Sequence, residues 1–185
     1  MIYAPAGIIL TINMDELDQM WSQMLEEATA AARSSGRHDV ADYLDLRVRN
    51  DVLRRAGVRW LFDGLIGVAG EAIRTFATVE IERLEPHNFP HRGANIAGSL
   101  LKFRHGVRCL TIEAGWTRTP ADGFMRGGAL AIAKITHFGM PKMNTELHLK
   151  HRDSGPGWVA FYPDGASIDA DEAFLRQHFS LFLGE

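Results

Sequence analysis

The sequence predicts an α+β fold in which an N-terminal helical segment and a C-terminal helix flank an antiparallel sheet of five or six strands. Apolar residues recur at helical spacing up to about residue 76 and then alternate with polar residues up to about residue 163. The strand-like segments are joined by short turns with no helix between them, which favours an antiparallel meander. Closure of these strands into a partial barrel is the alternative.

Three helices are expected in the helical segment, residues 1–76. The first begins after the N-cap candidate Asn13, the second spans about 39–57, and the third spans about 58–76. Glycines inside the third helix each weaken it by roughly 1 kcal/mol relative to Ala, so we expect a neighbouring element to approach closely there. These are Gly64, Gly67 and Gly70.

The sheet is expected between residues 77 and 163, with a break at 86–93 after the first strand. The expected strands cover 78–84, 96–104, 107–116, 129–138, 143–151 and 158–162. The dipeptide His105-Gly106 predicts a tight turn, so the second and third strands are expected to form a hairpin. Asp169 and Glu172 resemble a capping box and predict a C-terminal helix within 167–183.

Length and composition fit one globular domain covering residues 1–185, since 46% of the residues are apolar and 23% are charged. The single cysteine, Cys109, excludes an internal disulfide. No stretch reaches the roughly 18 uncharged apolar residues that a membrane span needs. We therefore expect a cytoplasmic protein that does not interact with membranes. Its oligomeric state is left open.

Charge is distributed unevenly along the chain. Residues 74–152 carry 12 Lys and Arg against 6 Asp and Glu, whereas the flanking parts are acidic and bring the net charge to −3. This basic middle segment predicts an anionic partner, such as a nucleic acid, a nucleotide or an acidic protein. In the alternative interpretation, the acidic flanks fold back on the segment and neutralise it.

The segment from Glu113 to Gly128 is the strongest candidate for a ligand-binding loop, because loops of this length inside compact domains tend to be functional. Arg118 and Arg126 offer guanidinium groups that suit phosphate or carboxylate. Trp116 offers a surface on which a base can stack, and Asp122 adds a polar group. Alternatively, an acid of the loop pairs with one of the arginines and only holds the loop in place.

Glu113 and His137 are the candidates for catalytic residues. Alternation along the third strand places Glu113 on the face opposite the apolar residues of that strand. The fifth strand likewise directs Glu146 and His148 outward. The histidines of the basic segment lack the spacing of a known ligand motif, so neither a metal nor another cofactor is predicted. The nearest candidates for metal ligands are His87 and His91.

No catalytic motif identifies a reaction. We therefore predict a non-catalytic module that binds an anionic ligand through the basic middle segment. The first alternative is a metal-dependent, nuclease-like hydrolase of phosphodiesters, which would use Glu113 together with histidines or a metal ion. The second alternative is a protein–protein interaction scaffold.

Overall fold

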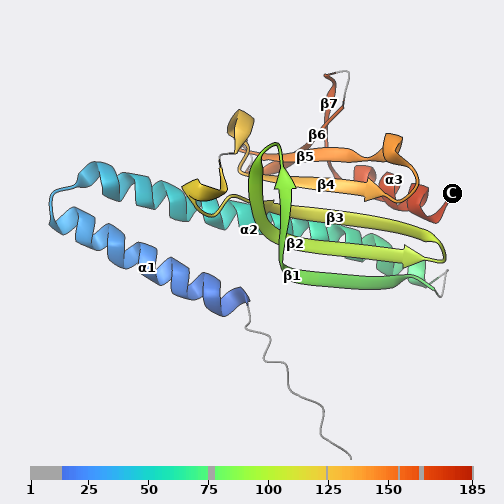
Figure 1. Cartoon of the computed structure of the whole chain (residues 1–185), viewed down its shortest axis with the longest axis horizontal. Coiled ribbons are helices and arrows are strands. Elements are labelled where there is room, and N and C mark those ends of the chain that lie inside the picture. Colours follow the sequence, from blue (N-terminus) through green and yellow to red (C-terminus); the bar gives the residue numbers. More distant parts are fainter. Residues whose placement is uncertain (1–13, 75–77, 124, 154, 163–164, 185) are drawn as a thin grey trace, which may run out of the picture. The chain divides into compact units, whose positions relative to one another are not determined.

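A computed structural model describes residues 14–74, 78–123, 125–153, 155–162 and 165–184 (Figure 1). The chain forms two compact parts, residues 1–49 and 50–185, and each is described by itself. The predicted α+β class is confirmed, because the described residues form three α-helices and a seven-stranded antiparallel sheet. That the two parts belong to one domain stays a prediction.

The N-terminal segment contains two long helices where the sequence predicts three. Helix α1 covers Met14–Ser34 and helix α2 covers His38–Ile73. Within the first part, Arg33 of α1 pairs with Asp45 of α2. The expected N-cap Asn13 and the expected helix end at residue 76 lie outside the described residues. In the part of the chain that the structure describes, no helix has the length and apolar character needed to cross a bilayer.

The expected helix boundary at Gly57 is wrong, because α2 continues through this residue. A Cβ atom at Gly57 would lie 2.5 Å from Leu149 Cδ2, so only glycine leaves room for that side chain. The Gly57 carbonyl also accepts a hydrogen bond from Trp158 Nε1 at 2.8 Å. Gly57 therefore marks a close contact between α2 and the sheet.

The three glycines expected to meet a close neighbour differ from one another. A Cβ atom at Gly64 would lie 2.8 Å from Leu175 Cδ1, which agrees with the expectation. At Gly67 and Gly70, a Cβ atom would meet no described atom within 4 Å beyond the helix's own backbone. Close packing thus explains Gly64 but not the other two glycines.

The strands form a meander in chain order, and each pairs antiparallel with the next. They are β1 (Glu80–His91), β2 (Ala94–His105), β3 (Arg108–Trp116), β4 (Ala131–His137), β5 (Thr145–Lys150), β6 (Gly157–Phe161) and β7 (Ser167–Asp169). The expected hairpin of β2 and β3 is confirmed, with His105 opposite Arg108. Strand β7 exceeds the predicted number because its three residues are too few to show an alternation in the sequence.

The predicted break at 86–93 is also wrong, because β1 continues to His91. The pairing of β1 with β2 shifts between Leu84 and His87, so the irregularity around Pro86 is a bulge within an edge strand. Beyond the bulge, the hairpin of β1 and β2 bends across the sheet towards β4 and β5 (Figure 1). Phe89 is buried beneath this bent end, in a small apolar cluster.

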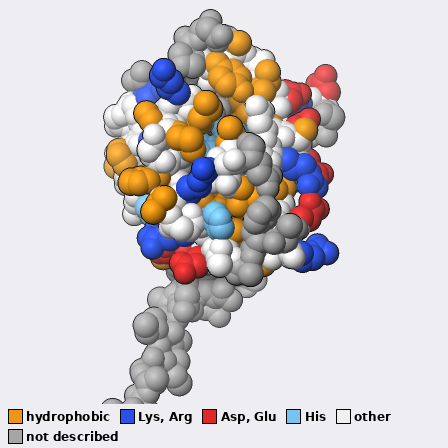
Figure 2. Space-filling model, turned by 90° about the vertical axis from the view of Figure 1, so that its right-hand side faces the viewer, with side chains coloured by type: hydrophobic (Ala, Val, Ile, Leu, Met, Phe, Trp, Pro, Cys, Tyr) orange, Lys and Arg blue, Asp and Glu red, His pale blue; other side chains and the backbone are white. Residues whose placement is uncertain are grey.

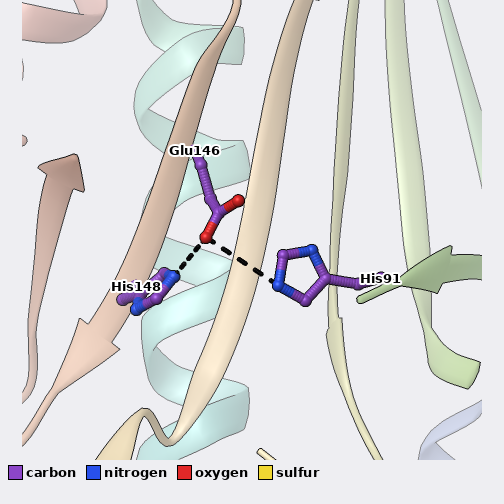
Figure 3. A group of neighbouring side chains, drawn as sticks. All are labelled: His91, Glu146 and His148. Carbon is purple, nitrogen blue, oxygen red and sulfur yellow. Dashed lines mark hydrogen bonds and ion pairs between the residues drawn. The ribbon is translucent and has the colours of Figure 1, made fainter. Parts of the chain in front are cut away.

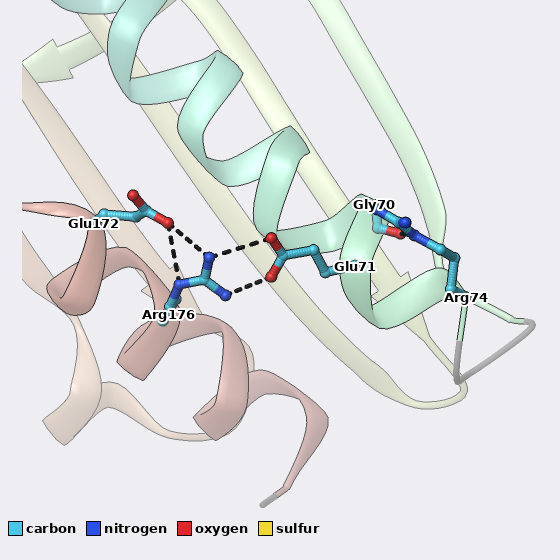
Figure 4. A network of polar contacts seen from close by, with 5 residues as sticks. All are labelled: Gly70, Glu71, Arg74, Glu172 and Arg176. Atoms are coloured by element: carbon cyan, nitrogen blue, oxygen red, sulfur yellow. Dashed lines mark hydrogen bonds and ion pairs between the residues drawn. The ribbon is translucent and has the colours of Figure 1, made fainter.

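Helices α2 and α3 (Glu172–Leu183) pack against one face of the sheet, where the main apolar core lies. The cap of α3 is Asp171 rather than the expected Asp169, and its carboxylate accepts a hydrogen bond from Phe174 N at 2.9 Å. The two helices are linked by Arg176, whose guanidinium lies between Glu71 and Glu172 (Figure 4). Among the described residues from 50 to 184, no helix packs against the other face of the sheet, which we call the polar face because it carries charged side chains beside the small apolar cluster around Phe89.

One end of the sheet exposes apolar side chains near its turns. Val107 is 90% exposed and Phe138 is 73% exposed. The view onto this end shows hydrophobic side chains in several groups, with Lys and Arg between them (Figure 2). This surface is compatible with the scaffold alternative, but nothing in the described residues indicates what would cover it.

Candidate metal centre on the polar face of the sheet

A row of charged residues crosses three strands on the polar face. Glu113 of β3 is in register with Lys134 of β4, and Lys134 is in register with Glu146 of β5. Adjacent strands lie about 4.8 Å apart, so the three residues are direct neighbours. Because Leu110 and Ile112 are buried on the helix-covered face, the alternation of β3 directs Glu113 to the polar face, as expected.

The bent end of the β1–β2 hairpin lies over this row. Lys134 Nζ donates a hydrogen bond to the Pro90 carbonyl at 2.6 Å, and it lies 5.4 Å from the centroid of the Phe89 ring. His87 Nε2 lies 2.8 Å from Glu113 Oε1. At the other end of the row, Arg92 Nη2 lies 3.0 Å from a Glu146 oxygen. The hairpin therefore brings histidines from β1 to the carboxylates of β3 and β5.

Three side chains at the Glu146 end form a set of potential metal ligands (Figure 3). The ligand atoms of His91, Glu146 and His148 all lie within 4.8 Å of one another. Both histidines turn Nε2 towards the same carboxylate oxygen, Oε1, at 3.8 Å for His91 and 2.6 Å for His148. Among the described residues, this is the one group of three His, Cys, Asp or Glu side chains with such geometry.

The electrostatics of this cluster favour a neutral His91 and an ionised Glu146. Burial lowers the pKa of His91, and it outweighs the opposing field of Glu146. His91 is therefore neutral near pH 7 and has a free lone pair. Burial acts to raise the pKa of Glu146, but the hydrogen bond from His148 and the charges nearby lower it overall. Glu146 is accordingly ionised.

The residue types and spacing fit a divalent transition-metal ion. Zinc binds imidazole nitrogen and carboxylate oxygen at about 2.0–2.2 Å in tetrahedral sites, which places the ligand atoms about 3.4 Å apart. The ligand atoms of the three side chains now lie up to 4.8 Å from one another, so side-chain movements of about an ångström would bring them to the spacing of a tetrahedral site. Binding through Nε2 also requires the His148 proton to move to Nδ1. Two histidines and one carboxylate would leave a fourth position open, which is the pattern of catalytic rather than structural zinc sites.

A shallow pocket opens beside the two histidines. It is lined by His91, Arg92, Ala94, Ile96, Met125, Ile132 and His148. Met125 belongs to the long loop that follows β3, so this loop contributes a wall even though its predicted binding residues lie elsewhere. The open position of a bound ion would thus adjoin a mainly apolar pocket with one guanidinium.

The binding residues predicted in the long loop are placed differently. Trp116 is 4% exposed and belongs to the main core, and the Arg118 guanidinium lies 4.0 Å from the centroid of its ring. The Asp122 carboxylate accepts hydrogen bonds from the backbone and hydroxyl of Thr119 and from the backbone of Arg118, and these bonds lower its pKa. Asp122 thus holds the loop through Thr119 and a backbone N–H, and the alternative in which an acid pairs with an arginine stays a prediction. The side chain of Arg126 lies outside the described residues, and anion binding by this loop stays a prediction.

The predicted catalytic residues do not meet each other. His137 is 2% exposed on the helix-covered face, and its Nε2 lies 2.8 Å from Nδ1 of His178. Glu113 lies on the opposite face and is paired with His87. The sequence does place Glu146 and His148 on one face of β5. It gives no signal that β1 continues past Pro86 and carries His91 to them.

The charges of the basic segment are partly neutralised inside the protein. Lys102 pairs with Glu82 within the segment, and Arg152 pairs with Asp169 of the acidic C-terminal flank.

No protein-family model matches the chain, and no curated protein or solved structure has significant similarity to it.

Proposed function

We propose that this protein binds a divalent transition-metal ion through His91, Glu146 and His148, with one coordination position left open. The observation that supports the proposal is the convergence of two Nε2 atoms on one carboxylate oxygen in a half-buried site. Zn²⁺ suits this ligand set best, because Mg²⁺ and Ca²⁺ prefer sites made of oxygen ligands alone. The anionic ligand expected from the basic middle segment would then bind at the ion.

Calorimetric titration of Zn²⁺ into untagged, EDTA-treated protein tests the proposal. We expect one ion per chain, with an affinity at least about tenfold weaker in His148→Ala and in His91→Ala, since loss of even an outer-shell partner costs about 10- to 100-fold. The matched control is His151→Ala, which removes an exposed histidine three residues beyond His148 and outside the cluster. Equal Zn²⁺ affinity in all four proteins would contradict the proposal.

Metal-dependent hydrolysis is the second candidate, and the pairing of His87 with Glu113 on the same face favours it. The distance of 2.8 Å between Nε2 and Oε1 is that of a general base and the group that orients it. If the pair acts on substrate, Glu113→Gln abolishes turnover of bis(p-nitrophenyl) phosphate by the Zn²⁺-loaded protein without changing Zn²⁺ affinity. Glu82→Gln, which alters an exposed glutamate of β1, is the control. Full activity of Glu113→Gln would remove this residue from the mechanism.

A further inference from the structure

We infer that the open position of the metal centre takes the carboxylate of a small organic acid whose hydrocarbon part occupies the adjoining pocket. Arg92 supplies the second contact to that carboxylate. The inference rests on the proposed metal binding and adds a ligand class to it.

Charge at the loaded site favours an anion. A divalent cation and ionised Glu146 together carry a charge of +1, because the two histidines are neutral ligands. Arg92 adds a second positive charge within 3.0 Å of Glu146. Lys134 lies in register between Glu146 and Glu113, so Glu113 offsets its charge and the excess comes from the ion and Arg92. A neutral ligand would leave this positive charge unbalanced, whereas a carboxylate reduces it.

Arg92 is placed to bind a carboxylate while it keeps its contact with Glu146. Nη2 is the guanidinium atom that lies 3.0 and 3.2 Å from the two oxygens of Glu146. A guanidinium has five N–H donors in a planar fork, so the remaining donors can address a second acceptor. The Arg92 side chain is 58% exposed, follows the candidate ligand His91 directly in the chain, and lines the same pocket.

The pocket distinguishes an organic acid from an inorganic anion. Ala94, Ile96, Met125 and Ile132 form its apolar lining, while its polar side chains are those of the two histidines and Arg92. Pockets for small organic ligands share this composition, in which an apolar surface surrounds a few polar groups that fix the orientation, but this pocket is small, about 20 Å³, so it has room only for a short alkyl group. Phosphate would bind at the ion and leave the lining in contact with water. A short alkyl chain would cover the lining, and each CH₂ group buried there strengthens binding about fourfold.

The test uses Co²⁺ as the metal, because its visible absorption spectrum reports a change in coordination. Protein loaded with Co²⁺ is titrated with acetate, butyrate, butyramide and inorganic phosphate. We expect spectral shifts with both carboxylates, with butyrate binding about fifteenfold more tightly than acetate because it has two more CH₂ groups, and no shift with neutral butyramide. Arg92→Gln should weaken butyrate binding at least tenfold at a Co²⁺ concentration that saturates the site of both proteins, because Arg92 also contacts the candidate ligand Glu146 and its loss changes Co²⁺ affinity. Arg83→Gln, which alters a glutamate-paired arginine of β1 away from the site, should change neither.

The outcomes separate the inference from the proposal beneath it. If Co²⁺ binds but no carboxylate shifts its spectrum, or if phosphate binds more tightly than butyrate, the organic-acid inference is overturned and metal binding stands. Equal butyrate affinity in Arg92→Gln and the unmodified protein would also overturn it. If Co²⁺ itself does not bind, the spectrum shows this before any acid is added, and both statements fail.

Discussion

Two groups of histidines lie on opposite faces of the same sheet and have different surroundings. On the helix-covered face, His137 and His178 are buried, with 2.8 Å between their ring nitrogens. On the polar face, His91 and His148 are half-buried on either side of Glu146. Side chains alternate along a strand, so a shift of one position decides which surroundings a histidine meets.

The difference indicates which of these histidines are suited to bind a metal ion. Burial lowers the pKa of His137 and lowers that of His178 to about 4, so the buried pair is neutral and stabilises the core by packing and hydrogen bonding. Among the described residues, no carboxylate lies close enough to that pair to complete a group of three potential metal ligands. On the polar face, His91 and His148 contact an ionised carboxylate, that of Glu146, and both line a pocket that is open to solvent.

Removal of a core side chain should have the largest effect on stability. Phe103 is fully buried and meets the Phe179 ring edge-to-face, with 5.4 Å between the centroids. Phe103→Ala should lower the free energy of unfolding by about 3–5 kcal/mol. On the polar face, His148→Ala should change it by less than about 1 kcal/mol in metal-free protein. Urea denaturation measures both, and similar losses in the two variants would remove the contrast between the faces.

Two glycines of α2 offer a matched pair of smaller effects. Gly57→Ala drives a Cβ atom to within 2.5 Å of buried Leu149, so it should destabilise the protein by about 1–3 kcal/mol. Gly67→Ala meets no described atom within 4 Å beyond its own helix, so the higher helix propensity of Ala should stabilise the protein by up to about 1 kcal/mol. Thermal unfolding followed by circular dichroism gives both values. Shifts of the same sign would show that α2 does not pack on the sheet through Gly57.

Acid should destabilise the protein through the buried histidine pair. The pKa of His178 is about 4 in the folded state and 6.5 as its ordinary value. Between these values the unfolded state binds a proton that the folded state does not. Stability is therefore complete above about pH 6.5 and falls by about 1.4 kcal/mol per pH unit as the pH decreases towards 4.

His178→Gln isolates this contribution from that of the carboxyl groups. The free energy of unfolding is measured from pH 7 to 4 in both proteins. The variant should show a shallower dependence, since it lacks one group that takes up a proton on unfolding. Parallel profiles would mean that His178 is protonated in the folded state at the same pH as in the unfolded chain.

Periodicity in the sequence predicts much of this fold. Alternation places Glu113, Glu146 and His148 on the outer face of their strands, and helical spacing locates α1, α2 and α3. The two wrong boundaries, at Gly57 and Pro86, share one physical reason. A helix or strand can continue through a glycine or a proline where contacts with neighbouring elements stabilise it at that residue. Leu149 and Trp158 hold Gly57 in place, and the edge position of β1 accommodates Pro86 as a bulge.

The candidate site was only half predictable. Glu146 and His148 are neighbours on one face of a strand, which is a local property of the sequence. His91 and Arg92 join them only because β1 continues past its bulge and bends over the sheet, which depends on contacts such as that between Lys134 and Pro90. The composition of the loop with Trp116 and Arg118 predicts a binding site more strongly than that of β5 does. In the structure, however, Arg118 stacks on Trp116 and Asp122 binds Thr119, so these side chains stabilise the loop.

The candidate ligands are divided between a fixed strand and the end of a hairpin. Glu146 and His148 lie in β5, which has a hydrogen-bonded strand on each side, whereas His91 is the last residue of the edge strand β1. Edge hairpins open locally more readily than central strands. In the proposed site, two ligands would therefore lie on a central strand and the third on the strand that opens more readily.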